Sequence, residues 1–540
     1  MSLPERPPAL ARIALAGILA LAVAHTLPFR DYLTDDTFIH LQFAKHLLRG
    51  AGFSFNAGEP TYGATSPLWV LLIAATGAAV PGSAATPADA ASTPALAWIA
   101  KAWGLACLLG AIVLLYRLGR RLGWSATQAL LPPFLLAANA WIARWTGSGM
   151  ETPLAILLVV ASLDALARTL LEDRSAWPAG ILLGLAFLAR PECVLLVFLA
   201  AIAVGANRTT RRRLIGILGG ALLSAGPWLL LAWTWFHRIL PNTSAAKAGS
   251  FGDLELATAA LRTSLRILLA TDALPIGLAI LGLALAGPEA LRKQPPERRA
   301  FWIAVSAWPL ALLFGLAMGG VQVVSRYLLP ALPSLALLGT ASMAWGAGWL
   351  RPPVRSLAWT ALIVLYLAQS AFLTIRYNVP HAVRHTAGLK SSLAAYGLWA
   401  RRETPPSTLF ALPDIGAFAY YADRPVLDLF GLTTPGMARV MVRAGYDAVV
   451  ERLLFEPYGR PAYLVDRART AARLERKDDP DDPYRFREAR TIPDLGLTRP
   501  GAWTYSLYDI DWAVFDHAHP HLAELNLSPR HAMIMRFPRS

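Results

Sequence analysis

Apolar segments long enough to cross a lipid bilayer recur from about residue 11 to about residue 375 and then stop. The chain is 55% hydrophobic and only 16% charged, whereas about a quarter of the residues in soluble globular chains are charged. This pattern predicts a polytopic α-helical membrane protein. Residues 1–375 are expected to form the membrane domain, and residues 376–540 a soluble domain long enough to bury a core of its own.

Short basic connections predict the direction of the spans. The first span runs from about Leu10 to Leu27 behind Arg6 and Arg12, which favours a cytoplasmic N-terminus. The next apolar run, Leu68–Val80, is shorter than a span requires and is expected to lie in the membrane interface. The later spans are then expected at about residues 95–116, 125–141, 153–171, 176–189, 192–206, 214–235, 267–287, 300–318, 327–348 and 356–375.

This arrangement gives about 11 transmembrane helices plus interfacial helices. It also places four basic connections in the cytoplasm, namely Arg117–Arg121, Arg208–Arg213, Arg292–Arg299 and Arg351–Arg355. The formal net charge of +15 lies largely in these short clusters, so it reports membrane topology rather than nucleic-acid binding.

Two adjacent carboxylates, Asp35 and Asp36, follow the first span. Paired carboxylates commonly hold a cation, or one of them takes a proton from an attacking hydroxyl group. Asp36 is alternatively placed to cap a helix from Phe38 to Leu48, although a cap requires only one such residue. The pair is therefore a candidate site, with a helix cap as the structural alternative.

The loop after the first span, residues 28–94, is expected to face away from the cytoplasm. Within it the helix 36–49 is amphipathic, with Gln42, Lys45 and Arg49 on one face and Ile39 and Phe43 on another. Such a helix is expected to lie in the membrane interface rather than cross the bilayer.

Polar residues between the later spans fall on the same side of the membrane as the carboxylate pair. They are Glu151, the Arg190–Pro191–Glu192 break between two short apolar runs, Asn242, Lys247 and Arg326. Acidic and basic groups gathered at one membrane face predict an active site there. Structural alternatives remain for each: a helix cap at Glu151, an ion pair between Arg190 and Glu192, and headgroup contact by Lys247.

The segment after about residue 376 alternates short apolar runs with turns. Residues 408–412, 414–421 and 425–429 are expected to form a strand, a short helix and a strand, which predicts a small α/β domain. The charged segment from Asp466 to Arg490 is expected to form a surface helix and loop.

Several motifs resemble those of a known family. Asp35–Asp36, Gly50-x-Gly52, Asn56-x-Gly58–Glu59 and Gly63-x-Thr65–Ser66–Pro67–Leu68–Trp69 resemble the first extracytoplasmic loop of GT-C glycosyltransferases, in particular of the bacterial arabinofuranosyltransferase-like group. Later landmarks of similar kind are Gly149–Met150–Glu151–Thr152–Pro153, Ala189–Arg190–Pro191–Glu192, Leu240–Pro241–Asn242–Thr243, Arg326–Tyr327 and Asp414–Ile415–Gly416. The chain departs from the pattern at Cys193, where Gly is common, and at Ser244–Ala245, where bulkier aromatic residues are common.

The resemblance implies an enzyme of the bacterial cell envelope. Its donor would be a polyprenyl-phosphate-linked sugar, with arabinofuranose or a similar pentose favoured. Its acceptor would be a glycan, lipid or protein outside the cytoplasmic membrane, where the active site and the C-terminal domain would both lie. The reaction would be an inverting single displacement.

The resemblance also implies roles for particular residues. Asp35 or Asp36 would be the base that deprotonates the acceptor hydroxyl, and the pair is also a candidate site for Mg²⁺, Mn²⁺ or Ca²⁺. Lys247, Arg190 and Arg326 would contact the donor phosphate. Further candidates for donor binding are Glu151, Asn242, Glu192, His40 and Tyr62.

Three alternatives remain open. A hexosyl transferase, such as a mannosyl transferase, would use the same fold. A transporter or lipid flippase is permitted by intramembrane charges, although we find no repeated halves and the charges gather at one face rather than at mid-membrane. A binding protein without activity would leave the carboxylate pair and the facing cations without a role.

Overall fold

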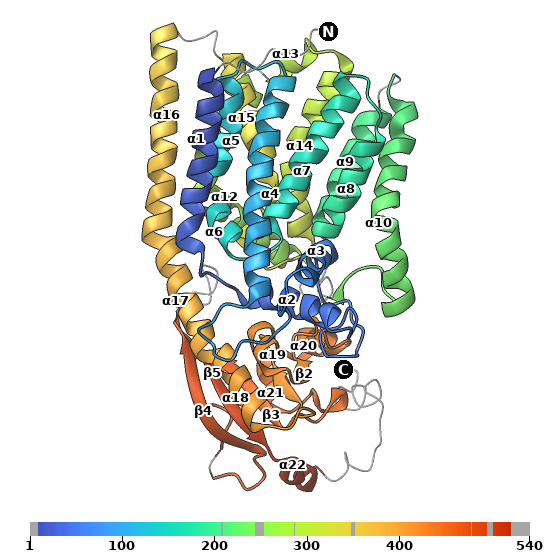
Figure 1. Ribbon diagram of the computed structural model, residues 1–540, viewed down its shortest axis with the longest axis vertical. Helices are drawn as coiled ribbons and strands as arrows, with labels where there is room; N and C mark the ends of the chain where they lie inside the picture. The colour runs from blue at the N-terminus through green and yellow to red at the C-terminus, as the bar shows by residue number, and fades with distance from the viewer. Residues whose placement is uncertain are drawn as a thin grey trace.

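The computed structural model describes residues 9–206, 209–242, 253–285, 287–346, 351–476, 478–493 and 501–519. A bundle of long helices forms one half of the molecule, and a smaller unit built on a β-sheet forms the other (Figure 1). The first loop lies between the two halves.

Helices that run the length of the bundle form the first half. They are α1 (Ala9–Thr26), α4 (Ala95–Arg121), α5 (Leu131–Ala138) continued by α6 (Ala140–Gly147), α7 (Thr152–Leu171), α8 (Trp177–Ala189), α9 (Val194–Gly205), α10 (Leu214–Phe236), α12 (Leu254–Leu285), α14 (Pro296–Met318), α15 (Leu332–Gly346) and α16 (Pro352–Leu373). A short helix, α13 (Gly287–Arg292), connects α12 to α14.

The bundle has the character of a membrane domain. Within the described ranges, 7 helices are long and apolar enough to cross a membrane, and α8 and α9 are among the shorter apolar helices beside them. Large apolar side chains are exposed on its outer surface, for example Leu222 and Leu230 on α10 and Leu365 on α16, as expected where lipid replaces water. The chain is therefore a multi-pass membrane protein, and the figure of about 11 crossings stays a prediction.

The two ends of the bundle differ in their chemistry. The connections α4–α5, α9–α10, α12–α14 and α15–α16 lie at the end where the chain begins, and these carry the Arg-rich sequences (Figure 1). The connections that carry Glu151, Arg190 and Arg326 lie at the opposite end, next to the first loop and the sheet unit. The expected gathering of these residues at one face of the bundle is observed.

The first loop contains α2 (Asp35–Leu48) and α3 (Pro67–Ala78). That α2 lies in the membrane interface stays a prediction. Gln42 and Lys45 on its polar face are buried. Gln42 donates to the Phe55 carbonyl within the first loop, whereas Lys45 packs against the sheet unit. There the Lys45 Nζ donates to the Tyr420 carbonyl at 2.7 Å and to Asp423 Oδ1 at 2.8 Å.

The second half contains a five-stranded mixed sheet with strand order β2-β1-β3-β5-β4. Its strands are β1 (Phe410–Leu412), β2 (Val426–Asp428), β3 (Tyr463–Ala468), β4 (Tyr484–Ile492) and β5 (Trp503–Ile510). β1 pairs in parallel with β2 and β3, whereas β5 pairs antiparallel with β3 and β4. The helices are α17 (Val379–Leu389), α18 (Ala395–Glu403), α19 (Gly416–Ala422), α20 (Met437–Ala444), α21 (Tyr446–Glu451) and α22 (Trp512–Ala518).

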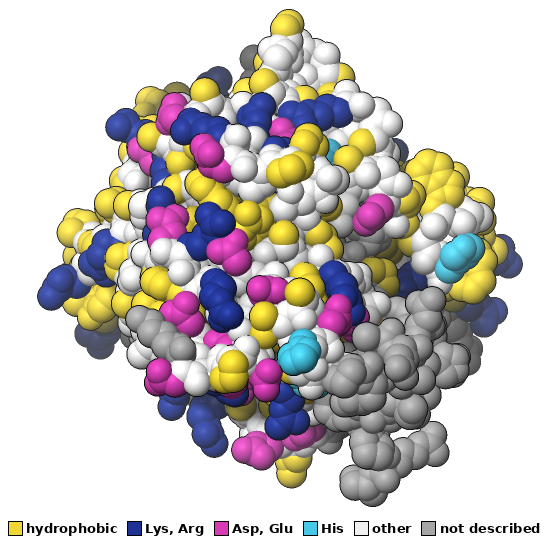
Figure 2. Space-filling model, turned by 90° about the horizontal axis from the view of Figure 1, so that it is seen from below, with side chains coloured by type: hydrophobic (Ala, Val, Ile, Leu, Met, Phe, Trp, Pro, Cys, Tyr) yellow, Lys and Arg dark blue, Asp and Glu magenta, His cyan; other side chains and the backbone are white. Residues whose placement is uncertain are grey.

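The expected strand–helix–strand order is confirmed by β1, α19 and β2. The expected surface helix in the segment from Asp466 to Arg490 is wrong, because this segment contains the end of β3, turns and most of β4. β4 is an edge strand whose charged side chains are partly exposed, an arrangement that protects an open sheet edge. Basic and acidic side chains intermingle on the face of this half that points away from the bundle (Figure 2).

A continuous helix joins the two halves. It runs from Ser356 to Glu403 and includes α16, α17 and α18. Two π-helical turns, Thr374–Asn378 and Lys390–Ala394, flank α17. The core is also continuous, since Phe38 of α2 packs against Tyr420 and Tyr421 of α19 with ring centroids 5.6 and 5.7 Å apart.

Candidate active site

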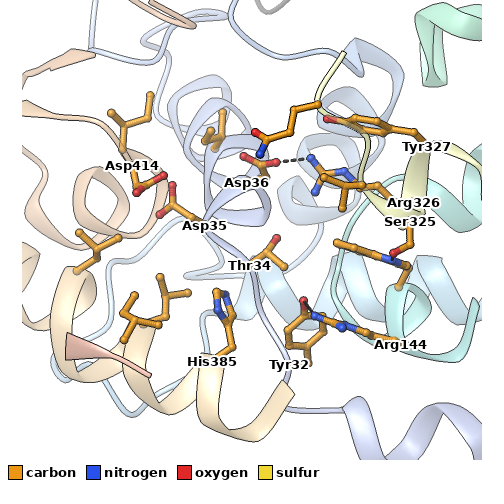
Figure 3. Close-up of a pocket in the computed structure, with 18 of the residues that line it drawn as sticks. Tyr32, Thr34, Asp35, Asp36, Arg144, Ser325, Arg326, Tyr327, His385 and Asp414 are labelled. Atoms are coloured by element: carbon orange, nitrogen blue, oxygen red, sulfur yellow. Dashed lines mark hydrogen bonds and ion pairs between the residues drawn. The ribbon is translucent and has the colours of Figure 1, made fainter. Parts of the chain in front are cut away.

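A cavity of about 370 Å³ lies where the bundle, the first loop and the sheet unit meet. The first loop contributes Tyr32, Thr34, Asp35, Asp36 and Ile39 to its lining. The bundle and its connections contribute Trp141, Arg144, Trp145, Ile267, Gln322, Val324, Ser325, Arg326 and Tyr327, and the C-terminal half contributes His385, Leu389, Leu393, Pro413, Asp414, Ile415, Phe430, Leu432, Ile492 and Tyr505. All three parts of the chain are therefore needed to form it (Figure 3).

The two carboxylates begin α2 without capping it. The N-cap is Thr34, whose hydroxyl accepts from the Thr37 N–H while the Thr37 side chain accepts from the Thr34 N–H. The alternative that Asp36 serves as the helix cap is therefore wrong. Neither carboxylate caps the helix, and at its first two positions they face its positive dipole end.

Asp35 is held by the backbone of the C-terminal half. Its Oδ2 accepts from the Gly416 N–H at 2.9 Å and its Oδ1 from the Ala417 N–H at 2.8 Å. Figure 3 shows its carboxylate facing that of Asp414. Burial, and then the negative charge of Asp414, raise the pKa of Asp35 to about 7, although the two N–H donors oppose this shift. A carboxylate whose pKa has this value can accept a proton near neutral pH.

Asp36 points in a different direction and forms an ion pair with Arg326 (Figure 3). The Arg326 guanidinium lies 5.3 Å from the ring centroids of both Trp145 and Tyr327. Burial opposes the charged form, but the interactions with Asp36, Tyr327 and Glu151 outweigh it and raise the pKa of Arg326. Asp36 therefore fixes a cation in the cavity wall.

Arg190, Glu151 and Glu192 form a buried ion cluster behind this wall. The Arg190 guanidinium donates to Glu151 at 2.6 Å and to Glu192 at 2.7 Å, and it stacks 4.8 Å from the Tyr327 ring centroid. Nearby positive charge lowers the pKa of Glu151 although burial opposes it. The three residues are absent from the lining of the cavity described above, and Arg190 contacts the Tyr327 ring from behind it. Their expected part in donor binding stays a prediction.

The remaining residues expected at the site lie elsewhere. The buried His40 lies close enough to Glu151 to lower its pKa. The Tyr62 hydroxyl accepts from the Trp228 indole N–H at 2.8 Å, and its carbonyl accepts from the Asn242 N–H at 2.8 Å. These contacts place Tyr62 and Asn242 in packing outside the cavity. Lys247 lies outside the described residues.

Sequence reasoning missed several residues that line the cavity. Arg144 and Trp145 belong to α6, which was treated only as the connection after a span, although an Arg beside apolar segments was a usable signal. Asp414 precedes α19 and was noted as a family landmark but given no role. Tyr32 and His385 carried no local pattern that set them apart.

The carboxylate pair does not present a shared site for a cation in this arrangement. Asp35 is directed toward α19 and Asp36 toward Arg326 (Figure 3). In the part of the chain that the structure describes, no group of three or more His, Cys, Asp or Glu side chains is placed to hold a metal ion. A divalent cation at Asp35 and Asp36 stays a prediction.

Comparisons with known proteins bear on the class of this molecule. Residues 381–515 match the model of a domain of unknown function, DUF8728. A comparison with curated protein sequences gives no match. Solved structures, however, resemble the whole architecture.

Three of these structures are informative. ArnT from Cupriavidus metallidurans bound to undecaprenyl phosphate is 14% identical, with a TM-score of 0.55 over 83% of this chain and 92% of that one. The oligosaccharyltransferase of Archaeoglobus fulgidus in its apo form is 13% identical, with a TM-score of 0.52 over 84% of this chain and 69% of that one. The arabinofuranosyltransferase AftD from Mycobacteria is 17% identical, with a TM-score of 0.53 over 94% of this chain and 40% of that one.

The molecule is thus a multi-pass membrane protein with a cavity at one end of its helix bundle. Its fold is similar to that of ArnT, of the archaeal oligosaccharyltransferase and of AftD. At these identities the likeness concerns the fold, and the activity must be argued from the site.

Proposed function

We propose that this protein is a glycosyltransferase that moves a sugar from a polyprenyl-phosphate donor to an acceptor hydroxyl group bound in the cavity. The observation that carries the proposal is the state of Asp35. Among the described residues its side-chain partners are two backbone N–H groups and no cation, and its pKa of about 7 suits a general base.

In this reaction Asp35 takes the proton of the acceptor hydroxyl as its oxygen attacks the anomeric carbon of the sugar. The bond between that carbon and the phosphate oxygen breaks, and polyprenyl phosphate leaves with the bonding electrons. No residue of the protein attacks the sugar, so the anomeric configuration inverts. Asp36 acts by holding Arg326 in the cavity wall. There the positive charge of Arg326 stabilises the negative charge of the departing phosphate.

The structural relatives support this choice of donor. The structure of ArnT contains undecaprenyl phosphate, and the bundle of the present chain offers the apolar surroundings that such a lipid requires. The likeness to AftD favours an arabinofuranosyl group, with a mannosyl or other hexosyl group as the alternative. The acceptor would be a glycan, lipid or protein.

We further propose the location and division of the molecule. The Arg-rich end of the bundle would face the cytoplasm of a bacterium, so the cavity and the C-terminal half would face outward from the cytoplasmic membrane. Residues 1–375 would supply the membrane domain and residues 376–540 the domain that completes the cavity.

The test uses the full-length protein in lipid nanodiscs, polyprenyl-phosphate arabinofuranose or mannose, and a glycan acceptor pool. Free polyprenyl phosphate is quantified for the wild type, Asp35→Asn and Asp36→Asn. Asp31→Asn is the matched control, because this neighbouring side chain is 66% exposed. We expect a loss of about 10²–10⁴-fold in Asp35→Asn, as for removal of a general base, a loss in Asp36→Asn, and no change in Asp31→Asn.

Equal release by all four proteins would show that the carboxylates have only a structural role. Lipid binding without release from any donor would favour the transporter alternative instead.

A further inference from the structure

Arg144 is a buried cation in the cavity wall, and among the described residues it has no acidic partner. The residue is 4% exposed, and its Nη2 donates to the Tyr32 hydroxyl at 2.8 Å and to His381 Nδ1 at 2.9 Å. Both acceptors are neutral groups. Within the described part of the chain no carboxylate lies within ion-pair distance of Arg144, and its buried Nε has no hydrogen-bond partner.

Lys101, a buried cation at the same end of the bundle, donates to two backbone carbonyls. Three others are paired with carboxylates. Arg326 is paired with Asp36, Arg190 with Glu151 and Glu192, and Lys45 with Asp423. Each of these charges is balanced by the protein itself. Arg144 is balanced only by the faces of aromatic rings, those of Tyr32, Trp141 and Trp145, at 4.9, 5.7 and 5.7 Å.

A purely structural role does not account for this arrangement. An Arg side chain carries five N–H donors, and the contacts of Arg144 with described residues involve Nη2 alone. A neutral side chain could link Tyr32 to His381 without the cost of burying a charge. The unused donors and the unbalanced charge both indicate an anionic ligand.

The position of Arg144 in the cavity indicates which anion. Figure 3 shows Arg144, Tyr32 and His385 together on the side of Thr34 opposite to Asp35 and Asp36. Arg144 and Arg326 both lie against the ring of Trp145. An anion at Arg144 would thus share the cavity with the proposed base without contacting it.

The backbone also fixes this wall. The Lys101 Nζ of α4 donates to the Tyr32 carbonyl at 2.5 Å and to the Gly147 carbonyl at the end of α6. It therefore ties the segment that carries Tyr32 to the helix that carries Arg144. A pre-positioned guanidinium and hydroxyl are suited to a phosphate, since charge-assisted hydrogen bonds of this kind are short and strong.

We infer that Arg144 and Tyr32 form an anion site that binds the phosphate of a polyprenyl phosphate, on the opposite side of the cavity from Asp35. This inference rests on the proposed function for the identity of the lipid. Of the residues expected at this phosphate, Arg326 lines the same cavity, whereas Arg190 is absent from its lining. As the bond to the sugar breaks, the phosphate changes from a diester with one negative charge to a monoester with up to two, and Arg144 stabilises the added charge.

The test measures binding separately from transfer. Farnesyl phosphate is titrated into the full-length protein in nanodiscs, with Trp fluorescence as the signal because Trp141 and Trp145 line the cavity. Farnesol is the neutral probe, and inorganic phosphate and phosphatidic acid are competitors. The variants are Arg144→Gln, Arg144→Lys and Tyr32→Phe, with Arg168→Gln as a control that removes a partly exposed Arg outside the cavity.

We expect Arg144→Gln to weaken farnesyl phosphate binding by about 10- to 100-fold, the usual effect of losing a hydrogen bond to a charged group. Farnesol binding should not change, Arg144→Lys should restore part of the affinity, and Arg168→Gln should match the wild type. Tyr32→Phe should weaken binding less, because the ring remains. Thermal unfolding of each variant checks that the fold is retained, and Arg144→Lys keeps the test valid if Arg144→Gln is unstable.

Unchanged farnesyl phosphate affinity in Arg144→Gln would overturn the inference, as would an equal loss of farnesol binding. The assignment to polyprenyl phosphates would be overturned if phosphatidic acid bound more tightly than farnesyl phosphate. Tighter binding of inorganic phosphate than of farnesyl phosphate would overturn it as well. If binding depends on Arg144 but the wild type releases no lipid phosphate from any sugar donor, the anion site stands and the transferase proposal fails. If the wild type transfers the sugar and Arg144→Gln binds and reacts like the wild type, the transferase proposal stands and the anion site fails.

Discussion

Gly416 is the point where the C-terminal half meets the proposed base, and it leaves no room for a side chain. A Cβ added here would lie 2.0 Å from the Asp35 carbonyl oxygen, 2.9 Å from the carbonyl carbon and 3.1 Å from Cγ. The first two atoms belong to the backbone of α2, so no rotation of a side chain can relieve the contact. Gly416→Ala must therefore separate α19 from α2.

The size of the effect follows from this distance. Contacts of a Cβ below 3.0 Å essentially do not occur, so α19 has to withdraw by about 1 Å from the Asp35 oxygen. A shift of this size lengthens the 2.9 and 2.8 Å bonds from Gly416 and Ala417 beyond normal hydrogen-bond distance. We expect a loss of about 1–3 kcal/mol in stability from overpacking and about a 10²-fold lower kcat from displacement of the base.

The assay measures release of polyprenyl phosphate at saturating donor, together with the Tm of the protein in nanodiscs. Gly17→Ala is the matched control, because a Cβ at this position in α1 meets no atom within 4 Å. Farnesyl phosphate binding should persist in Gly416→Ala, since Arg144 lies on the other side of the cavity, and this shows that the protein is folded. A wild-type kcat in Gly416→Ala would refute the argument that α19 positions Asp35.

Further predictions concern pH, the buried ion cluster and metal ions. Because Asp35 must be ionised to act, kcat/KM should rise with pH and level off above about 7. Asp414→Asn should move this rise to lower pH, because it removes a negative charge that raises the pKa of Asp35. The pKa of Asp35 is higher in the folded than in the unfolded state, so the contribution of Asp35 to stability is present at low pH and is lost as pH rises through about 7. The Tm of the wild type should therefore fall over this pH range, and the Tm of Asp35→Asn should lack this fall. Glu151→Gln should lower the free energy of unfolding by up to about 3–5 kcal/mol, because it leaves the buried charge of Arg190 incompletely balanced. Glu192→Gln should lower it less, since that side chain is 22% exposed. The Tm values of the two variants test this order. EDTA tests the predicted cation at Asp35 and Asp36. A loss of product release that Mg²⁺, Mn²⁺ or Ca²⁺ restores would support this cation. Unchanged release would show that the two carboxylates act with their protein partners alone.

Local patterns in the sequence predicted the features that local physics determines. Apolar runs predicted the helices of the bundle, because a span must be apolar over its whole length. Arg clusters predicted which connections share an end of the bundle, and alternating apolar runs predicted β1, α19 and β2. The adjacent carboxylates also indicated the part of the first loop that lines the cavity.

Contacts between distant segments were beyond such patterns. Asp35 meets Gly416 across 381 positions of sequence, and nothing near either residue indicates the other. Lys45 was placed on the polar face of α2, but its partners could not be predicted: it is buried because Asp423 and the Tyr420 carbonyl accept its hydrogen bonds. The charge of Arg190, which was expected at the donor phosphate, is balanced by two glutamates.

The C-terminal half is best understood as part of the proposed active site. The segment that matches a domain of unknown function, residues 381–515, supplies Asp414, which raises the pKa of Asp35, and the N–H groups of α19 that hold it. The same segment forms the apolar wall that includes Phe430 and Leu432. Because α16, α17 and α18 form one helix across the expected boundary at residue 375 and α18 packs against α19, a tilt of that helix would move α19 relative to α2. The position of the proposed base is therefore coupled to the packing of the last helix of the bundle.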